Sequence, residues 1–155
     1  MSTESIYNYR KVSDGVITGG QPTKEQLESA AQEGVDAVIN LATFHRRYSL
    51  EDEAGWVQSL GMDYVNIPVN WENPQESDYR AFEEAMTRLG DRRVLIHCAA
   101  NFRVTAFYAL YGLSHLGWSE SQAEDFRASI WMGSNYPLWE KFILEMKAKL
   151  AASAD

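Results

Sequence analysis

The segment that most constrains this chain is residues 93–105, with the sequence RVLIHCAANFRVT. Residues 94–96 are apolar and predict a short buried strand, which ends at His97 and Cys98. A tight loop of small residues follows, and Arg103 opens a strong helical pattern. The first N–H groups of that helix, and the positive end of its dipole, then surround the loop. The sequence therefore predicts an anion site that contains a thiol.

The residue types of this segment suit nucleophilic attack on an anion. A cysteine attacks as a thiolate, and a helix N-terminus, Arg103 and His97 are the usual means of lowering the pKa of a thiol such as Cys98. Arg103 adds a planar fork that can grip two oxygens of a tetrahedral anion. A cysteine at the end of a buried strand is also often a small core residue, and the loop, arginine and helix together favour the functional interpretation.

Ile96, His97 and Cys98, followed by a short loop and Arg103, resemble the signature of the cysteine-dependent protein tyrosine and dual-specificity phosphatases. The likeness is closer to small bacterial relatives, the phosphatase-like domains also found fused to beta-lactamase-like hydrolases. The matching blocks are residues 17–22 (ITGGQP), 38–41 (VINL), 64–69 (YVNIPV) and 95–103, within residues 5–116. The resemblance implies a dual-specificity-phosphatase-like fold and hydrolysis of a phosphate monoester without a metal or cofactor.

The resemblance also implies roles within the segment. Cys98 would be the nucleophile, and Arg103 would hold the phosphoryl oxygens. The remaining substrate-contacting residues would be His97, Ala99, Ala100, Asn101, Phe102 and Thr105. Thr105 lies seven positions after Cys98, where those phosphatases carry a hydroxyl that helps the thiolate leave.

The loop departs from the phosphatase signature in length. Four residues separate Cys98 from Arg103, whereas the signature has five, usually including a glycine. A loop shorter by one residue loses up to ~3.5 Å of contour and forms a tighter cradle. Rhodanese-type sulfurtransferases have a loop of about this length, so sulfur transfer is the alternative chemistry. Asn101 is the loop residue best able to replace a glycine at positive φ.

The general acid is predicted in the loop after the strand at residues 63–68. The dual-specificity phosphatases carry an aspartate there, and alignment on the Ile-Pro pair places it near Trp71, which cannot donate the proton. The neighbouring Glu72 is the best substitute and Asp78 the second. Asn73 and the following Pro-Gln-Glu resemble a helix start with a capping box, which would leave Asp78 on exposed first turns.

A basic cluster, His45, Arg46 and Arg47, follows the predicted strand at residues 36–41. Loops after parallel strands gather at one edge of a sheet, so this cluster would share an edge with the cysteine loop. Arg46 and Arg47 could then form a positive rim for an anionic substrate. The alternative is a solvated loop with no role.

The rest of the chain predicts one α/β domain over residues 1–155, with a mostly parallel central sheet, flanking helices and an N-terminal β-hairpin. The hairpin joins residues 6–12 and 15–18 around an Asp-Gly turn. Helices are predicted at residues 23–33, 50–60, 73–89, 103–116, 120–131 and 138–150. Residues 117–155 supply the C-terminal helices, packed through Trp131, Tyr136, Trp139 and Phe142.

Composition narrows the classes of partner. The net charge of −8 argues against nucleic acid and anionic membranes and leaves room only for a local basic site. The resemblance to the phosphatases implies a phosphorylated small molecule or phosphoprotein as the substrate. The single cysteine excludes an internal disulfide, and the three histidines lack metal-ligand spacing. Residues 1–10 do not resemble a signal peptide, so we expect a soluble, cytoplasmic protein.

Three functions are consistent with these observations. The first is a cysteine-dependent phosphatase in which Cys98 forms a phosphocysteine and Glu72 or Asp78 protonates the leaving group. The second is sulfur transfer through a persulfide on Cys98. The third is an oxyanion-binding module that has lost catalysis.

Overall fold

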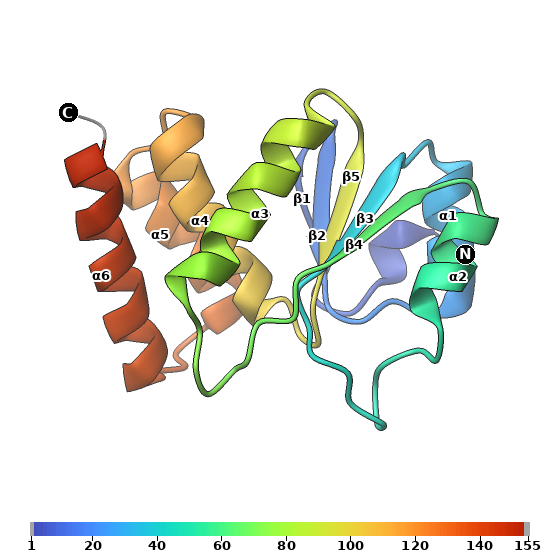
Figure 1. Cartoon of the computed structure of the whole chain (residues 1–155), viewed down its shortest axis with the longest axis horizontal. Helices are drawn as coiled ribbons and strands as arrows, with labels where there is room; N and C mark the ends of the chain where they lie inside the picture. Colours follow the sequence, from blue (N-terminus) through green and yellow to red (C-terminus); the bar gives the residue numbers. More distant parts are fainter. Residues whose placement is uncertain (1, 154–155) are drawn as a thin grey trace.

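A five-stranded sheet with strand order β1-β2-β5-β3-β4 forms the centre of the computed structural model, which describes residues 2–153 (Figure 1). β1 and β2 pair antiparallel, and the other three pairs are parallel. The strands are β1 (Arg10–Ser13), β2 (Val16–Gly19), β3 (Ala37–Asn40), β4 (Asp63–Asn66) and β5 (Val94–His97). The predicted mostly parallel sheet with an N-terminal hairpin is confirmed.

Helices cover both faces of the sheet (Figure 1). Alternate residues of β5 enter different cores, because side chains alternate across a strand. Leu95 packs with α1 (Lys24–Gln32) and α2 (Glu53–Ser59), while Ile96 packs with the cluster on the other face. That second face carries α3 (Glu76–Leu89), α4 (Phe102–His115), α5 (Glu120–Trp131) and α6 (Pro137–Ser153). Within residues 2–153, no helix is both long and apolar enough to cross a membrane.

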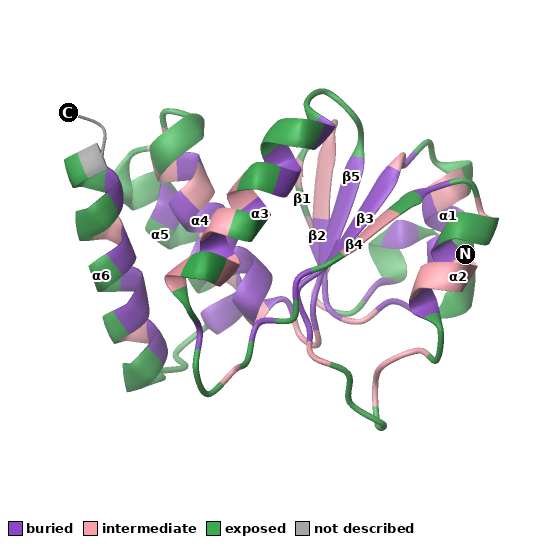
Figure 2. Cartoon of the chain, viewed as in Figure 1, coloured by how far each residue is buried: buried purple, intermediate pink, exposed green. Residues whose placement is uncertain are grey.

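β5 is the middle strand, and all four of its residues are buried (Figure 2). His97, its last residue, pairs with Gly19 of β2 on one side and with Asn40 of β3 on the other. The carboxyl ends of the three strands therefore lie level with one another. The loops that follow β3 and β5 leave from this common edge, as the sequence predicts.

The N-terminal strand differs from its prediction. It begins at Arg10 rather than residue 6, because Asn8 has a φ of 53° and turns the chain. The carbonyl of Asn8 accepts a hydrogen bond from Asn101 Nδ2, and Asn8 Nδ2 donates one to the carbonyl of Ala100. Asn8 thus bonds to the cysteine loop, and residues 6–9 do not lengthen the hairpin.

Two helices also start later than predicted. α2 begins at Glu53, since Asp52 is its N-cap and accepts a hydrogen bond from the N–H of Gly55. The predicted cap of α3 at Asn73 is wrong. Gln75 is the N-cap, and the capping box is completed by Asp78.

Candidate functional site

The cysteine loop joins β5 to α4. Cys98 is only 1% exposed, and its N–H donates to the carbonyl of Gly19 at 3.3 Å. Asn101 has a φ of 70°, so it takes the left-handed conformation predicted for it and directs the chain into α4. The helix begins at Phe102, one residue before the predicted start.

The carbonyls of the loop are held from outside it. Those of Cys98, Ala99 and Ala100 face His97 Nδ1 (3.3 Å), the N–H of Gln21 (3.0 Å) and Asn8 Nδ2 (2.9 Å), respectively. In a trans peptide the N–H points away from the C=O. Holding the first two carbonyls outward therefore turns the N–H groups of Ala99 and Ala100 toward the inside of the loop. This is the arrangement that an anion-binding loop requires.

The side chain of Asn101 fastens the loop to the body of the protein. Its Nδ2 donates to the carbonyl of Asn8 at 2.8 Å and to Thr18 Oγ1 at 3.0 Å. Both bonds are absent for a glycine at this position. Asn101 therefore supplies the backbone conformation of a glycine and adds two anchors to β2 and the N-terminal segment.

Arg103 lies in the first turn of α4 and is 5% exposed. Its Nη1 donates to the carbonyl of Val69 at 2.9 Å. Val69 belongs to the loop between β4 and α3, which also carries Trp71 and Glu72. The arginine thus connects the cysteine loop with the loop predicted to supply the acid.

His97 and Glu53 form a buried ion pair behind the cysteine loop. Their side chains are 0% and 5% exposed, and Nε2 of His97 lies 2.6 Å from Oε2 of Glu53. Gln21 Nε2 donates to the other carboxylate oxygen at 2.8 Å. Both ring nitrogens of His97 face protein atoms, so its side chain supports the loop from behind instead of lining it.

The surroundings of Glu53 favour its charged form. Burial raises the pKa of this carboxyl, but the charge of His97 and hydrogen bonds with His97, Gln21 and Tyr64 outweigh burial and lower the pKa below its usual value. The pKa of Tyr64 is raised to about 12 by burial and by the charge of Glu53. No motif marks Glu53 in the sequence, because a glutamate in the first turn of a helix is commonly explained by the helix dipole.

Thr105 is fully buried on α4. Its Oγ1 donates to the carbonyl of Asn101 at 2.8 Å and accepts from Trp131 Nε1 at 3.0 Å. The hydroxyl predicted to assist the leaving thiolate thus links the end of the loop to α5.

The two predicted acids have different environments. Glu72 is exposed in the turn after Trp71, and Asn70 Oδ1 accepts a hydrogen bond from its N–H at 2.9 Å. Asp78 Oδ2 accepts from the N–H of Gln75 at 3.0 Å within the cap of α3. Glu72 therefore lies on the loop that Arg103 contacts, whereas Asp78 has a structural role at a helix start.

Comparison with solved structures decides the family. A candidate phosphatase (DUF442) from Shewanella putrefaciens CN-32 matches with a TM-score of 0.85 and 34% sequence identity, over 95% of this chain and 95% of that chain. The chain belongs to the DUF442 family. Neither a model of a known protein family nor a curated protein matches it.

More distant phosphatase structures share the DUF442 fold. The core catalytic domain of the PP-IP phosphatase SIW14 from S. cerevisiae, in complex with citrate, has a TM-score of 0.75 at 13% identity, over 96% of this chain and 94% of that chain. PTPMT1 in complex with PI(5)P has a TM-score of 0.75 at 19% identity, over 96% and 99%. The predicted resemblance to the tyrosine and dual-specificity phosphatases, and the predicted fold, are confirmed.

In this DUF442 chain, Arg46 and Arg47 are exposed on the loop between β3 and α2. The ring of His45 stacks on Tyr48 with centroids 5.0 Å apart, which orders the base of that loop. Because β3 and β5 are parallel neighbours, both arginines leave from the same edge of the sheet as Cys98. The topology thus places a positive loop and the cysteine loop on one side of the molecule.

An aromatic cluster, unforeseen in its extent, flanks the other side of the cysteine loop. Its members are Trp71, Phe102, Trp131, Tyr136 and Trp139. Trp131 and Trp139 are buried between helices as predicted, whereas Tyr136 is 39% exposed. Trp139 Nε1 donates to the carbonyl of Trp71 at 2.7 Å. The cluster fixes the acid-bearing loop against α4, α5 and α6.

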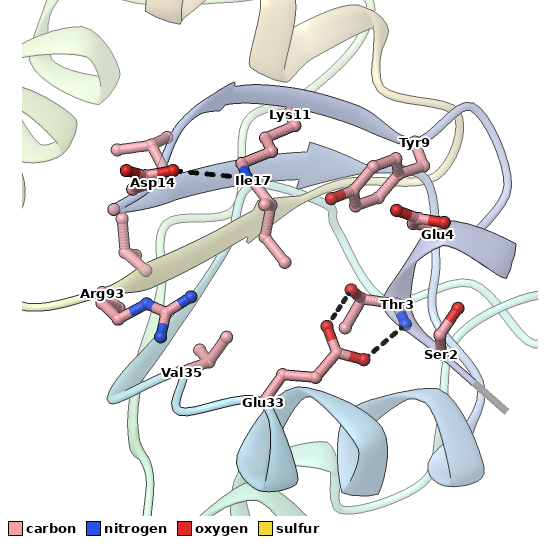
Figure 3. A pocket seen from close by; sticks show the side chains of 13 residues that line it. Ser2, Thr3, Glu4, Tyr9, Lys11, Asp14, Ile17, Glu33, Val35 and Arg93 are labelled. Carbon is pink, nitrogen blue, oxygen red and sulfur yellow. Dashed lines mark hydrogen bonds and ion pairs between the residues drawn. The ribbon is translucent and has the colours of Figure 1, made fainter.

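Two surface hollows differ in their relation to the site. One, of about 480 Å³, begins at Ala99 and is lined also by Tyr7, Lys24 and Tyr48. The other, of about 330 Å³, lies at the opposite edge of the sheet, where β2 and β5 begin (Figure 3). There Glu33 accepts hydrogen bonds from the N–H and hydroxyl of Thr3, so its carboxylate is already partnered. The hollow at Ala99 is the one that includes a residue of the cysteine loop.

Possible metal ligands are not grouped in the described part of the chain. Within residues 2–153, no three histidine, cysteine, aspartate or glutamate side chains are placed to hold a metal ion. The start of α4, with Arg103 in its first turn, directly follows the cysteine loop and brings positive charge to this part of the chain.

Proposed function

We propose that this protein is a cysteine-dependent phosphatase that hydrolyses a phosphate monoester through a phosphocysteine intermediate. The observation that carries the proposal is the cysteine loop, whose Cys98 and Ala99 carbonyls are held by His97 and Gln21 and which leads directly into α4. The N–H groups of Ala99 and Ala100 are then available to an anion. Membership of the DUF442 family of candidate phosphatases supports it.

In the proposed reaction, the thiolate of Cys98 attacks phosphorus in line, and the bond to the leaving oxygen breaks. The N–H groups of the loop and the guanidinium of Arg103 stabilise the negative charge on the three other oxygens. The leaving oxygen takes a proton from Glu72. Water then attacks the phosphocysteine, inorganic phosphate leaves, and Cys98 returns to its thiolate form.

Glu72 is the stronger candidate for the general acid. It is free to face a substrate because it lies exposed on the loop that Arg103 contacts through Val69. The carboxylate of Asp78 is the second candidate, since it accepts the cap hydrogen bond of α3. A general acid contributes most when the leaving group is poor. Removing the true acid should therefore slow hydrolysis of a substrate with a poor leaving group, and removing the other carboxylate should not.

The substrate would be a phosphorylated small molecule or a phosphoprotein. SIW14 is a PP-IP phosphatase and PTPMT1 holds PI(5)P, so relatives of this fold bind phosphorylated ligands. In this chain the hollow beside Ala99 offers Tyr7, Tyr48 and Lys24 to the group that carries the phosphate. Arg46 and Arg47 would add a positive rim for further anionic groups.

Sulfur transfer is the second candidate. The four-residue spacing from Cys98 to Arg103 favours it, because the shorter loop is the rhodanese-like length. In that reaction the thiolate of Cys98 would take the outer sulfur atom of thiosulfate as a persulfide while sulfite leaves. A nucleophilic acceptor such as cyanide would then take that sulfur atom and restore the thiolate.

The deciding experiment compares wild type with Cys98→Ser in the hydrolysis of an activated aryl phosphate from about pH 5 to 7.5. We expect turnover by wild type and none by the variant, because an activated leaving group isolates the cysteine loop from the acid. If wild type and Cys98→Ser are both folded and neither hydrolyses the aryl phosphate, the proposal is overturned. Thiosulfate:cyanide turnover, or a mass gain of one sulfur on Cys98, would then indicate sulfur transfer.

A further inference from the structure

We propose that Glu53 is a positioning residue that sets the state of the Cys98 thiol through His97. The effect on turnover rests on the proposed phosphatase function, whereas the effect on the thiol does not. Glu53 lies on α2, 45 residues before Cys98, and does not belong to the cysteine loop.

The first step is the placement of the pair. Nε2 of His97 lies 2.6 Å from Oε2 of Glu53, and both side chains are almost completely buried. Burying two charged groups is costly, so such a pair requires further hydrogen bonds. Gln21 Nε2 supplies one at 2.8 Å, and the hydroxyl of Tyr64 supplies another from β4. The carboxylate is thus held from β5, from β4 and from the loop after β2.

The second step is the count of protons. The two ring nitrogens of His97 face the carboxylate of Glu53 and the carbonyl of Cys98. A carbonyl oxygen only accepts, so Nδ1 must carry a hydrogen. A carboxylate accepts as well, so a second proton is held between Nε2 and Oε2 while Glu53 is present. A neutral histidine beside an ionised carboxylate carries one proton in total. The pair of His97 and Glu53 holds two, one at Nδ1 and one between Nε2 and Oε2.

The third step links that proton to the nucleophile. The Nδ1–H of His97 holds the carbonyl of Cys98 outward, which turns the N–H of Ala99 inward. The imidazolium is adjacent in sequence to Cys98, and the balancing carboxylate lies on its far side. The protonated Nδ1 side of the ring therefore faces the backbone of Cys98 and the carboxylate lies at Nε2, an arrangement that favours the thiolate over the thiol.

Few other titratable groups share this region. Tyr64 of β4 contacts Glu53 and has a pKa of about 12, so it remains neutral at moderate pH. Arg103 of α4 is charged throughout. Neither group replaces the proton held by the pair of His97 and Glu53.

The test is a titration of the thiol, independent of turnover. Cys98 is the only cysteine in the sequence. The thiolate absorbance of each protein is measured, and that of the same protein with Cys98→Ser is subtracted. The difference follows the titration of the Cys98 thiol alone. We expect Glu53→Gln, which keeps the shape of the side chain, to raise the titration midpoint by roughly one pH unit. Glu28→Gln is the matched control, because it removes an exposed carboxylate from α1 and should leave the midpoint unchanged.

A second variant separates positioning from simple structural damage. In a His97→Asn background, Glu53→Gln should no longer raise the midpoint, because the two residues act as one unit. An unchanged midpoint in folded Glu53→Gln overturns the inference. An equal upward shift in both backgrounds overturns it as well. If the midpoint shifts as expected while wild type fails to hydrolyse any aryl phosphate, the proposed function fails and the positioning role stands.

Discussion

Nη1 of Arg103 donates a hydrogen bond to the carbonyl of Val69 at 2.9 Å. This bond joins the two loops on which the proposed chemistry depends, because Val69 is three residues before Glu72 in the loop after β4. In the proposed reaction the same guanidinium also holds an anion at Cys98. Substrate binding and the position of the loop that carries Glu72 would therefore be coupled through one side chain.

Arg103→Lys is expected to lower kcat/KM for an aryl phosphate by about 100-fold, because a lysine ammonium cannot replace the planar fork that holds two oxygens. Arg88→Lys, an exposed change on α3, is the matched control and should retain full activity. Steady-state kinetics on both variants check this. Wild-type activity in Arg103→Lys would show that the guanidinium does not contact the transferred group.

Glu72→Gln should affect poor leaving groups selectively. We expect kcat for an alkyl phosphate to fall by about 100-fold and kcat for an activated aryl phosphate to change little, since the latter needs no proton. Asp78→Asn should instead lower stability by about 1 kcal/mol without distinguishing the leaving groups, because it weakens the cap of α3. The opposite pattern would transfer the acid role to Asp78.

Asn101 should tolerate glycine better than alanine. Asn101→Ala is expected to destabilise the fold by about 1 kcal/mol more than Asn101→Gly, because only the alanine is strained at a φ of 70°. Both variants lose the hydrogen bonds to Asn8 and Thr18. Urea unfolding measures the difference. Equal stabilities would mean that the left-handed turn relaxes in the variants.

The ion pair of Glu53 and His97 predicts an acid-sensitive fold. The pKa of Glu53 is lowered from an ordinary value of 4.5. A carboxyl with a lowered folded pKa stabilises the protein above its unfolded pKa, and this contribution is lost as the pH falls through the folded value. The free energy of unfolding should thus decline below about pH 4.5, and less steeply in Glu53→Gln. Parallel curves for the two proteins would contradict this.

The exposed arginines should matter only for substrates with several charges. Replacing Arg46 and Arg47 by alanine is expected to raise KM for a polyanionic phosphate by about tenfold at low salt and to leave an aryl phosphate unaffected. Measuring KM at low and high ionic strength checks the electrostatic origin. A loss of activity on both substrates would indicate that the loop between β3 and α2 supports the site structurally.

The cysteine loop could be predicted because its determinants are local. A buried strand, a small-residue turn with Asn101 and the start of a helix follow one another within residues 93–105, and each has its own sequence pattern. The alternation of strands and helices likewise predicted the parallel sheet. These elements depend on neighbours in the sequence.

The residues that hold the cysteine loop in place could not be predicted, because they are distant from it in the sequence. Glu53 is 44 residues from His97, and Asn8 is 93 residues from Asn101. Only the folded sheet brings these pairs together. For the same reason the sequence pattern predicts a strand that includes residues 6–9, since the left-handed Asn8 is stabilised by contacts with the cysteine loop rather than by its own neighbours.

The aromatic cluster beside the cysteine loop gives the protein a built-in optical probe. Trp71, Trp131 and Trp139 are three of its five tryptophans, and the ring of Trp71 lies within 5.8 Å of the other two by centroid distance. Trp71 is also part of the acid-bearing loop that Arg103 holds through Val69. In the proposed function an anion held by Arg103 lies one hydrogen bond away from this loop, so ligand binding should change the environment of the Trp71 indole. Intrinsic fluorescence should report that binding without any added label.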